Sequence, residues 1–411
     1  MDMLSLREYP ISYLLTLTAF FFSEHATWAQ VSSKDSLSLR QLEKTDLIDF
    51  AGRAYRAIDK NKAKSQRPGT EGTVHFSVIP VAPAPSGQGS ISVSAINASF
   101  FMAKETNLSS VYFYPYTNFS TSYGITLSPY IWFPKNEWNG TGDFRIAFNG
   151  LRDYGLGGEI PATEYTVIDH SHIRTYFTAH TRIHKSYYLG TGYNLDYFFG
   201  VVEKDPSPTT DSEFKQYGIG TGTETVSSGV TVNFLRDDRR NSVNPSNGQY
   251  TAAVIRVNRK AMGSTFEWSS IFIESRRYHS FSTHRHKILA ARAFYWGTLG
   301  DVPYFNLPAT FGDPGGRAGR GYFTDRFRGQ HMLYAEGEYR FDITSHGFLG
   351  GVLFANMQSY TNASGNFAYI LPAAGFGFRF KFNRHSDTNI TLDFALGKEG
   401  WNWYINLGEF F

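Results

Sequence analysis

Apolar and polar residues alternate in segment after segment of this chain, from near Val74 to the end of the sequence. The alternation is clearest in residues 374–383, where phenylalanine stands at every second position from Phe376 to Phe382 and glycine, arginine or lysine stands between. Successive side chains of a β-strand point to opposite faces, so this segment predicts a strand with one apolar face and one polar face. In a soluble sheet the polar face meets water. In a membrane barrel the apolar face meets lipid and the polar face lines the lumen.

Composition narrows the class of protein. Aromatic residues make up 17% of the chain and charged residues 18%, and the mean hydropathy is −0.32. After residue 30 no apolar run approaches the roughly 18–20 residues of a membrane-spanning helix. A barrel wall suits these values, although a soluble β-sandwich would have a similar composition. The absence of cysteine excludes a disulfide framework, a zinc-thiolate site and a cysteine nucleophile. A net charge of +3 gives no indication of nucleic-acid binding.

The alternating segments number about sixteen, and an even number is expected of a single-chain outer-membrane barrel. The expected strands are 74–82, 90–102, 109–120, 124–133, 141–151, 166–182, 185–199, 222–235, 248–258, 265–278, 286–296, 330–343, 348–359, 371–383, 389–396 and 401–411. If both ends of the barrel lie in the periplasm, the long connections 152–165, 200–221 and 297–329 all fall on the outer side. A sandwich has no reason to sort its loops in this way. The one long inner connection is 236–247.

The N-terminal region has a different character. Residues 11–22 form an apolar core of signal-peptide length, and Thr27-Trp28-Ala29 offers a small-x-small cleavage site. We therefore expect residues 1–29 to be a secretory signal peptide. Residues 30–72 carry the helical spacing of Leu47, Phe50 and Ala54, which predicts a short periplasmic helical segment. Residues 73–411 would then form the barrel.

The two ends of the barrel must meet, because an open sheet edge in lipid leaves backbone groups unsatisfied. The last expected strand contains Trp403 and Gly408 and ends on Phe411, which is similar to the terminal signal by which barrels are handed to their assembly machinery. Glu409 departs from that signal. The first expected strand carries Pro80, which removes a hydrogen-bond donor and favours a weak seam.

Three motifs resemble the BamA/TamA outer-membrane assembly-factor superfamily, the bacterial surface-antigen barrels. The first motif is in the connection 297–329, the sixth outer loop of the expected topology, and comprises Gly315, Gly316, Arg320, Gly321 and Tyr322. The resemblance implies that this loop folds back into the lumen and that Arg320 meets acidic groups of the wall.

The wall strand that follows carries Glu336, Glu338 and Arg340, which alternation places on the lumen face. A buried carboxylate is costly unless paired, so Arg320 is a sensible partner. In the next strand Asn356 takes the place of the family's usual aspartate, which would leave the loop with Glu336 and Glu338 as its only partners.

The second motif is a periplasmic turn. Arg236, Asp237, Pro245 and Gly248 resemble the family's turn signature, although Phe234 stands in place of its first aspartate. The third is a closing pattern, in which glycines 375 and 377 and Arg379 are followed by Leu392-Asp393-x-Ala395. The resemblance covers about residues 74–411.

The resemblance implies a non-enzymatic barrel in the bacterial outer membrane, in contact with lipid, lipopolysaccharide and other assembly subunits. Residues 30–72 show no sign of the family's periplasmic POTRA domains, so an accessory role in outer-membrane protein assembly is the leading hypothesis. The alternatives are a channel gated by the sixth loop, or a surface-displayed binding barrel.

Other sites are weak candidates. His170 and His172, like His284 and His286, share a strand face, but no third ligand is fixed, so we expect no metal site. No nucleophile motif or phosphate loop is present, and we expect no cofactor and no nucleic-acid partner.

Overall fold

The computed structural model describes residues 74–411, except 87–88, 120–121, 159–160, 205–211, 283–286 and 368. They belong to one compact unit. The expected signal peptide, the expected helical segment 30–72 and the pair His284 and His286 lie outside the described residues.

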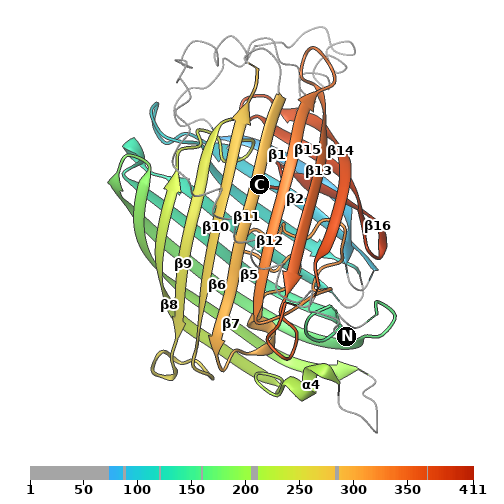
Figure 1. The fold of residues 1–411 in the computed structure, drawn as a ribbon. Coiled ribbons are helices and arrows are strands. Elements are labelled where there is room, and N and C mark those ends of the chain that lie inside the picture. The colour runs from blue at the N-terminus through green and yellow to red at the C-terminus, as the bar shows by residue number, and fades with distance from the viewer. Residues whose placement is uncertain are drawn as a thin grey trace, which may run out of the picture. The chain divides into compact units, whose positions relative to one another are not determined.

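The described unit is a single sheet of sixteen strands. Their bounds are β1 His75–Ser86, β2 Gly89–Phe100, β3 Ser109–Thr117, β4 Tyr123–Trp132, β5 Trp138–Asp153, β6 Thr166–His184, β7 Tyr187–Lys204, β8 Glu224–Asp237, β9 Gly248–Asn258, β10 Trp268–Ser280, β11 Lys287–Gly300, β12 His331–Asp342, β13 Leu349–Tyr360, β14 Leu371–Asn383, β15 Thr388–Gly397 and β16 Gly400–Leu407. Each strand pairs antiparallel with the next one along the chain, and Figure 1 shows them tilted side by side around the barrel. Each expected strand overlaps one of these strands, so the prediction of a sixteen-strand antiparallel barrel is confirmed.

Some of the connections between strands contain short helices. The helix α4 (Glu213–Tyr217) lies in the β7–β8 connection, at the lower end of Figure 1, and was not expected from the sequence. The 3₁₀ turns are η1 (Pro134–Asn136), η2 (Lys260–Met262) and η3 (Tyr304–Asn306). Among the described residues, no helix combines the length and the apolar character needed to cross a bilayer.

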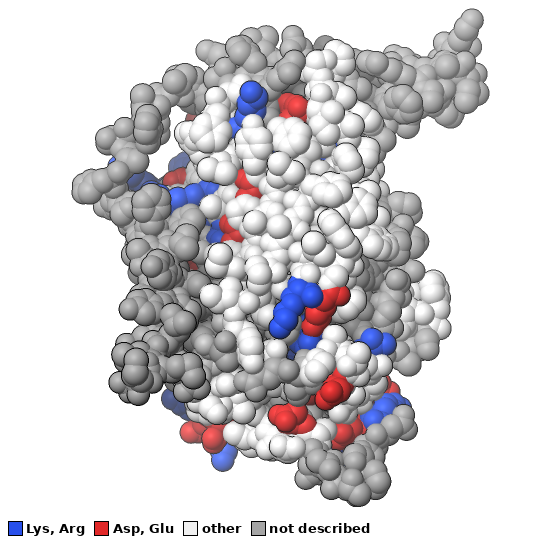
Figure 2. All heavy atoms as spheres, turned by 45° about the vertical axis from the view of Figure 1, so that its right-hand side comes forward, with Lys and Arg blue, Asp and Glu red and all other residues white. Residues whose placement is uncertain are grey.

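The two faces of the wall differ as alternation predicts. On β14, Phe376 is 42% exposed and points outward, whereas Arg379 is 4% exposed and points inward. Outward-facing apolar side chains recur around the sheet, and they include Phe76, Ile146, Phe177, Leu189, Val232, Ile255, Leu289 and Leu353. Figure 2 shows one face as mostly uncharged, with acidic and basic side chains gathered mainly toward its lower end. An apolar exterior around a polar interior is the arrangement of a membrane barrel.

The interior is filled in part by the β11–β12 connection, residues 301–330, which we call loop six. Its residues Ala318, Tyr322 and Phe327 are buried against inward-facing residues of the wall, such as Tyr334 and Tyr360. A second buried cluster lies beside α4, where Phe214 packs with Tyr304 and Leu307 of loop six and with Trp268. We call this second cluster the outer cap.

The ends of the sheet meet at a seam between β1 and β16. These strands lie close together, and in Figure 1 the red end of the sheet comes round to the blue end. In the described part of the chain no hydrogen-bonded ladder joins them, although every consecutive pair of strands has one. The pairing of β1 with β2 is irregular between Ile79 and Ala82, the position of Pro80. The ladder breaks where proline supplies no backbone donor.

The last strand is shorter than predicted. It was expected to run to Phe411, but β16 ends at Leu407. Gly408 has a φ of 86°, which glycine adopts without strain, and the chain turns there. Glu409, Phe410 and Phe411 are buried and continue no strand.

Candidate functional site

Loop six approaches the wall through its glycine motif. Gly316, Gly319 and Gly321 all have positive φ, at 62°, 124° and 106°, a region that residues with a side chain rarely adopt. A Cβ at Gly321 would also collide with the side chain of Ala373 on β14. Glycine therefore lets the loop turn and lie directly on the wall, and Tyr322 Oη donates to the carbonyl oxygen of Pro372 at 2.7 Å.

We expect Gly321→Val to lower the free energy of unfolding by about 2–4 kcal/mol, because it adds both backbone strain and a collision with Ala373. Urea unfolding in detergent measures the change, and limited proteolysis tests whether loop six becomes accessible. Gly222→Val is the matched control, since a Cβ at Gly222 meets no atom within 4 Å. Equal effects of the two variants would show that the close approach of Gly321 to β14 does not contribute to the free energy of unfolding.

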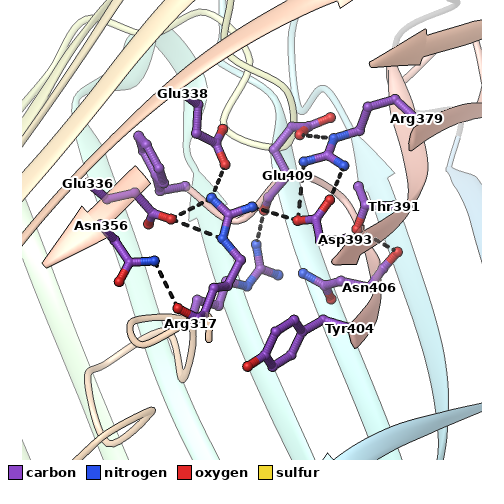
Figure 3. A network of polar contacts seen from close by, with 12 residues as sticks. Arg317, Glu336, Glu338, Asn356, Arg379, Thr391, Asp393, Tyr404, Asn406 and Glu409 are labelled. Carbon is purple, nitrogen blue, oxygen red and sulfur yellow. Dashed lines mark hydrogen bonds and ion pairs between the residues drawn. The ribbon is translucent and has the colours of Figure 1, made fainter. Parts of the chain in front are cut away.

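Arg320 is the centre of the site and is fully buried. Its Nε donates to Glu336 Oε1 at 2.9 Å and its Nη1 to Asp393 Oδ2 at 2.5 Å, while Nη2 contacts both Glu336 and Glu338. Figure 3 shows these three carboxylates converging, Glu336 and Glu338 from β12 and Asp393 from β15. The guanidinium also lies between two aromatic rings, 3.6 Å from the centroid of Phe354 and 4.3 Å from that of Phe410.

Further arginines balance these carboxylates. Arg340 Nε donates to Glu338 Oε2 at 2.7 Å, and Arg379 donates to Asp393 Oδ1 at 2.5 Å and to Glu409 Oε2 at 2.7 Å. Arg317 of loop six donates to the main-chain oxygen of Glu409. We call this set the arginine network, and it comprises Arg317, Arg320, Arg340, Arg379, Glu336, Glu338, Asp393 and Glu409. With four members of each sign it is formally neutral, as buried charges need to be.

The structure corrects one expectation about the partners of Arg320. The asparagine at position 356 was expected to leave Glu336 and Glu338 as the only partners, but Asp393 of β15 is a third. Asn356 contributes in another way, since its Nδ2 donates to the main-chain oxygen of Arg320 at 2.9 Å. Alternation on β15 already placed Asp393 on the inner face, and that signal could have identified it.

A second ion-pair group holds the base of loop six, and sequence reasoning missed it. Asp313 accepts the Nη2 of Arg292 at 2.7 Å, and Arg292 also pairs with Glu274 at 2.5 Å. Asp313 Oδ1 accepts the main-chain N–H groups of Arg317 and Ala318 at 2.8 and 2.9 Å. Burial raises the pKa of Asp313, but the Arg292 guanidinium outweighs it and leaves that pKa below its ordinary value. The carboxylate thereby shapes the turn that presents Arg320.

The terminal segment, residues 408–411, joins the same network. Asn389 Nδ2 donates to Glu409 Oε1 at 2.7 Å, and Arg340 Nη2 donates to the main-chain oxygen of Phe411 at 2.9 Å. The ring of Phe411 lies 6.2 Å from that of Tyr278. Trp403, in contrast, pairs with Phe394 across the β15–β16 ladder and is only half-buried. The terminal residues expected at the seam are therefore divided between the wall and the interior.

The connection 238–247, between β8 and β9, reaches across one end of the barrel. Asn241 Nδ2 donates to the carbonyl oxygen of Ser386 at 2.9 Å, and the main-chain N–H of Glu409 donates to the carbonyl oxygen of Val243 at 3.3 Å. On its other side Ser242 contacts Leu108 at 3.4 Å. These contacts join parts of the wall far apart in sequence, and they explain why this inner connection is long.

The predicted residues of this turn have structural partners. Asp237 pairs with Arg239 at 2.8 Å and accepts the hydroxyl of Tyr130 at 2.8 Å. Arg236 lies 5.1 Å from the ring centroid of Tyr187. Gly248 has a φ of 100°, and Pro245 is buried.

The predicted histidine pair faces the lumen. His172 Nε2 lies 3.0 Å from Asp196 Oδ1, and its ring stacks on Phe198. His170 stacks on Phe305 of loop six. Within the described ranges no group of three or more histidine, aspartate or glutamate residues is arranged to hold a metal ion.

Comparison with known proteins shows which solved structures have a similar fold. No family model and no curated protein sequence matches the chain. Among solved structures it is similar to BamA from Haemophilus ducreyi lacking POTRA domains 1–3, with 12% identity, a TM-score of 0.51 and coverage of 90% of this chain and 81% of that chain. It is also similar to CdiB from Acinetobacter baumannii, with 10% identity, a TM-score of 0.49 and coverage of 82% of this chain and 65% of that chain. The chain thus has the fold of the BamA barrel.

Proposed function

We propose that this chain is a bacterial outer-membrane barrel that takes part in assembling other outer-membrane proteins, as an accessory subunit. It would reach that membrane by way of a signal peptide, residues 1–29, and contact lipid, lipopolysaccharide and other assembly subunits. The outward apolar side chains and the inward polar network support a membrane location.

The observation that carries the assembly role is the seam. Fifteen consecutive strand pairs are joined by ladders, and β1 and β16 are the described neighbours that are not. Unpaired backbone groups at a sheet edge are a template on which another strand can pair. A barrel that can open at this edge could therefore offer a pairing site to an incoming strand within the membrane.

The arginine network suits this role because most of its contacts join strands on one side of the seam. Loop six joins β12, through Glu336 and Glu338, to β15, through Asp393. The wall on the β12–β15 side of the seam is thus held from inside, and these contacts would survive separation of β1 from β16. Arg317 Nη2 also donates to Tyr114 Oη on β3 at 3.2 Å, and this contact across the seam would be disrupted.

Depletion of the protein in its host tests the assembly role. We expect the abundance of other outer-membrane barrels to fall, as measured by quantitative proteomics of the membrane fraction, and the intact gene to restore it. The matched control is Lys260→Gln, a change at an exposed residue of η2 that should complement fully. Unchanged barrel levels after depletion would refute the role.

A second candidate function is a channel gated by loop six. The specific observation in its favour is that loop six leaves a cavity of about 850 Å³ in the lumen. Recordings from planar bilayers discriminate between the two functions, since an assembly factor needs no steady current.

A further inference from the structure

The lumen cavity is lined mostly by residues that do not belong to the arginine network. Inward-facing residues of β3 to β11 form most of it, and one side of loop six closes it. At one end the lining reaches Arg239 and Ser242 at the β8–β9 connection, and at the other it reaches Phe305 and Asn306 beside the outer cap. The cavity therefore follows the lumen from one end of the barrel toward the other.

The charge of this lining is unbalanced. Nine arginines and four acidic residues line the cavity, which is an excess of five positive charges. Two further carboxylates, Asp196 and Asp237, lie behind the lining and pair with lining arginines. Including these two carboxylates leaves an excess of three positive charges. One of these is the charge of Arg317, which is already balanced within the arginine network, so the rest of the lining has an excess of two.

Side-chain exposure adds to the imbalance at three arginines of the lining, each of which is more exposed than a carboxylate that it pairs with. In the Arg292–Glu274 and Arg328–Asp325 pairs the carboxylate is the more exposed partner. The side chain of Arg145 is 26% exposed against 12% for Asp143, and that of Arg276 is 18% exposed against 3% for Glu274. Arg174 is 13% exposed, whereas its partner Asp196 has no exposed surface. Around Arg145, Arg174 and Arg276, water in the cavity thus meets guanidinium groups more than carboxylates.

A cleft lined by charges of one sign, with walls of low dielectric constant, concentrates ions of the opposite sign. Guanidinium groups suit anions in particular, because they present several donors in a plane that matches carboxylate and phosphate oxygens. Hydroxyl groups of the lining, such as those of Tyr112 and Tyr176, add further hydrogen-bonding groups around the same space.

We propose that the cavity is an anion-selective path through the lumen, one that admits small inorganic anions and carboxylates and disfavours cations. Arg145 on β5 and Arg276 on β10 are its main selectivity-determining residues. The inference rests on the membrane location and on the second candidate function, and it is independent of the assembly role.

The test is the reversal potential of the full chain in planar bilayers under a potassium chloride gradient. We expect a chloride-to-potassium permeability ratio of about three or more, given the concentrating effect of such a lining. The double variant Arg145→Gln and Arg276→Gln should bring the ratio close to one, and replacement of both residues by lysine should restore it. Arg182→Gln is the matched control, because Arg182 binds the carbonyl oxygen of Lys135 and does not line the cavity.

Cation preference, absence of current, or a ratio unchanged in the double glutamine variant would each overturn the proposal. Heat-modifiable migration on gels confirms that each variant is folded. Failure of the assembly role would appear in the depletion experiment and would leave the permeability ratio untouched. A chain absent from the membrane fraction would instead refute the membrane location.

Discussion

Replacement of Arg320 by alanine is expected to lower the free energy of unfolding by about 3–5 kcal/mol, because Glu336 would stay buried without an ion-pair partner among the described residues. Glu338 and Asp393 would keep only Arg340 and Arg379. Glu336, Glu338 and Asp393 would remain inside the barrel while their shared guanidinium is gone. Urea unfolding in detergent, followed by heat-modifiable migration, measures the change. Limited proteolysis should also show faster cleavage within loop six.

The control for Arg320→Ala is Lys204→Ala, which removes an ion pair with Asp169 in which both partners are partly exposed. Such pairs contribute at most about 1 kcal/mol. Arg320→Lys should give an intermediate result, because an ammonium group cannot reproduce the planar geometry that serves three carboxylates. An Arg320→Ala variant that unfolds at the same urea concentration as the parent would contradict a stabilising role for the network.

The second large effect is expected at Phe410, outside any strand. Its ring lies 4.3 Å from the Arg320 guanidinium and edge-on to Tyr404 at 6.2 Å, and the residue is buried. Phe410→Ala removes this packing and leaves a void beside the network, which costs about 3–5 kcal/mol for a phenylalanine in a protein interior. The same unfolding measurement detects it.

Phe119→Ala provides the comparison for Phe410→Ala, because Phe119 is 85% exposed in the β3–β4 connection. Substitutions at such positions usually change stability by less than about 0.5 kcal/mol. Similar stabilities of the two variants would mean that the terminal segment merely rests in the lumen. A large difference would mean that residues 408–411 are part of the interior packing.

The two variants also probe whether loop six and the terminal segment act together. Arg317 contacts the main-chain oxygen of Glu409, and Arg320 packs on Phe410, so the loop and the segment share contacts. Energetic effects of residues in contact are generally not additive. The double variant Arg320→Ala and Phe410→Ala should therefore cost less than the sum of the single variants.

The positions of the strands were accessible from the sequence because alternation is a local property. On β14 the apolar or polar character of each residue between Phe376 and Phe382 predicts which face of the sheet its side chain occupies. The structure places phenylalanine outward and Arg379 inward. The resemblance of the glycine motif to that of a known superfamily likewise pointed to Arg320 as a residue that meets acidic wall groups.

The full set of residues that contact Arg320 could not be predicted from alternation. Asp393 is 73 residues from Arg320 along the chain, and it reaches the guanidinium because the barrel closes and loop six crosses its interior. Arg292 and Asp313 meet for the same reason. Periodicity says which face a side chain occupies, but it does not say which inward residues a folded-back loop will touch.

The terminal segment, residues 408–411, shows most clearly where prediction from local sequence fails. Its aromatic residues favoured a strand to the end, yet Gly408 turns the chain, and buried Glu409 bonds with Arg379. Local strand propensity was outweighed by a buried ion pair that exists only once the barrel is formed.

Alternation along single segments therefore predicts the number, direction and two faces of the strands, since these follow from a period of two. The completion of the arginine network and the end of β16 depend on the folded barrel. The same holds for the absence of a ladder between β16 and β1 in the described part of the chain. Each of these depends on which distant groups come together when the sheet curls round, and only the closed barrel sets those distances.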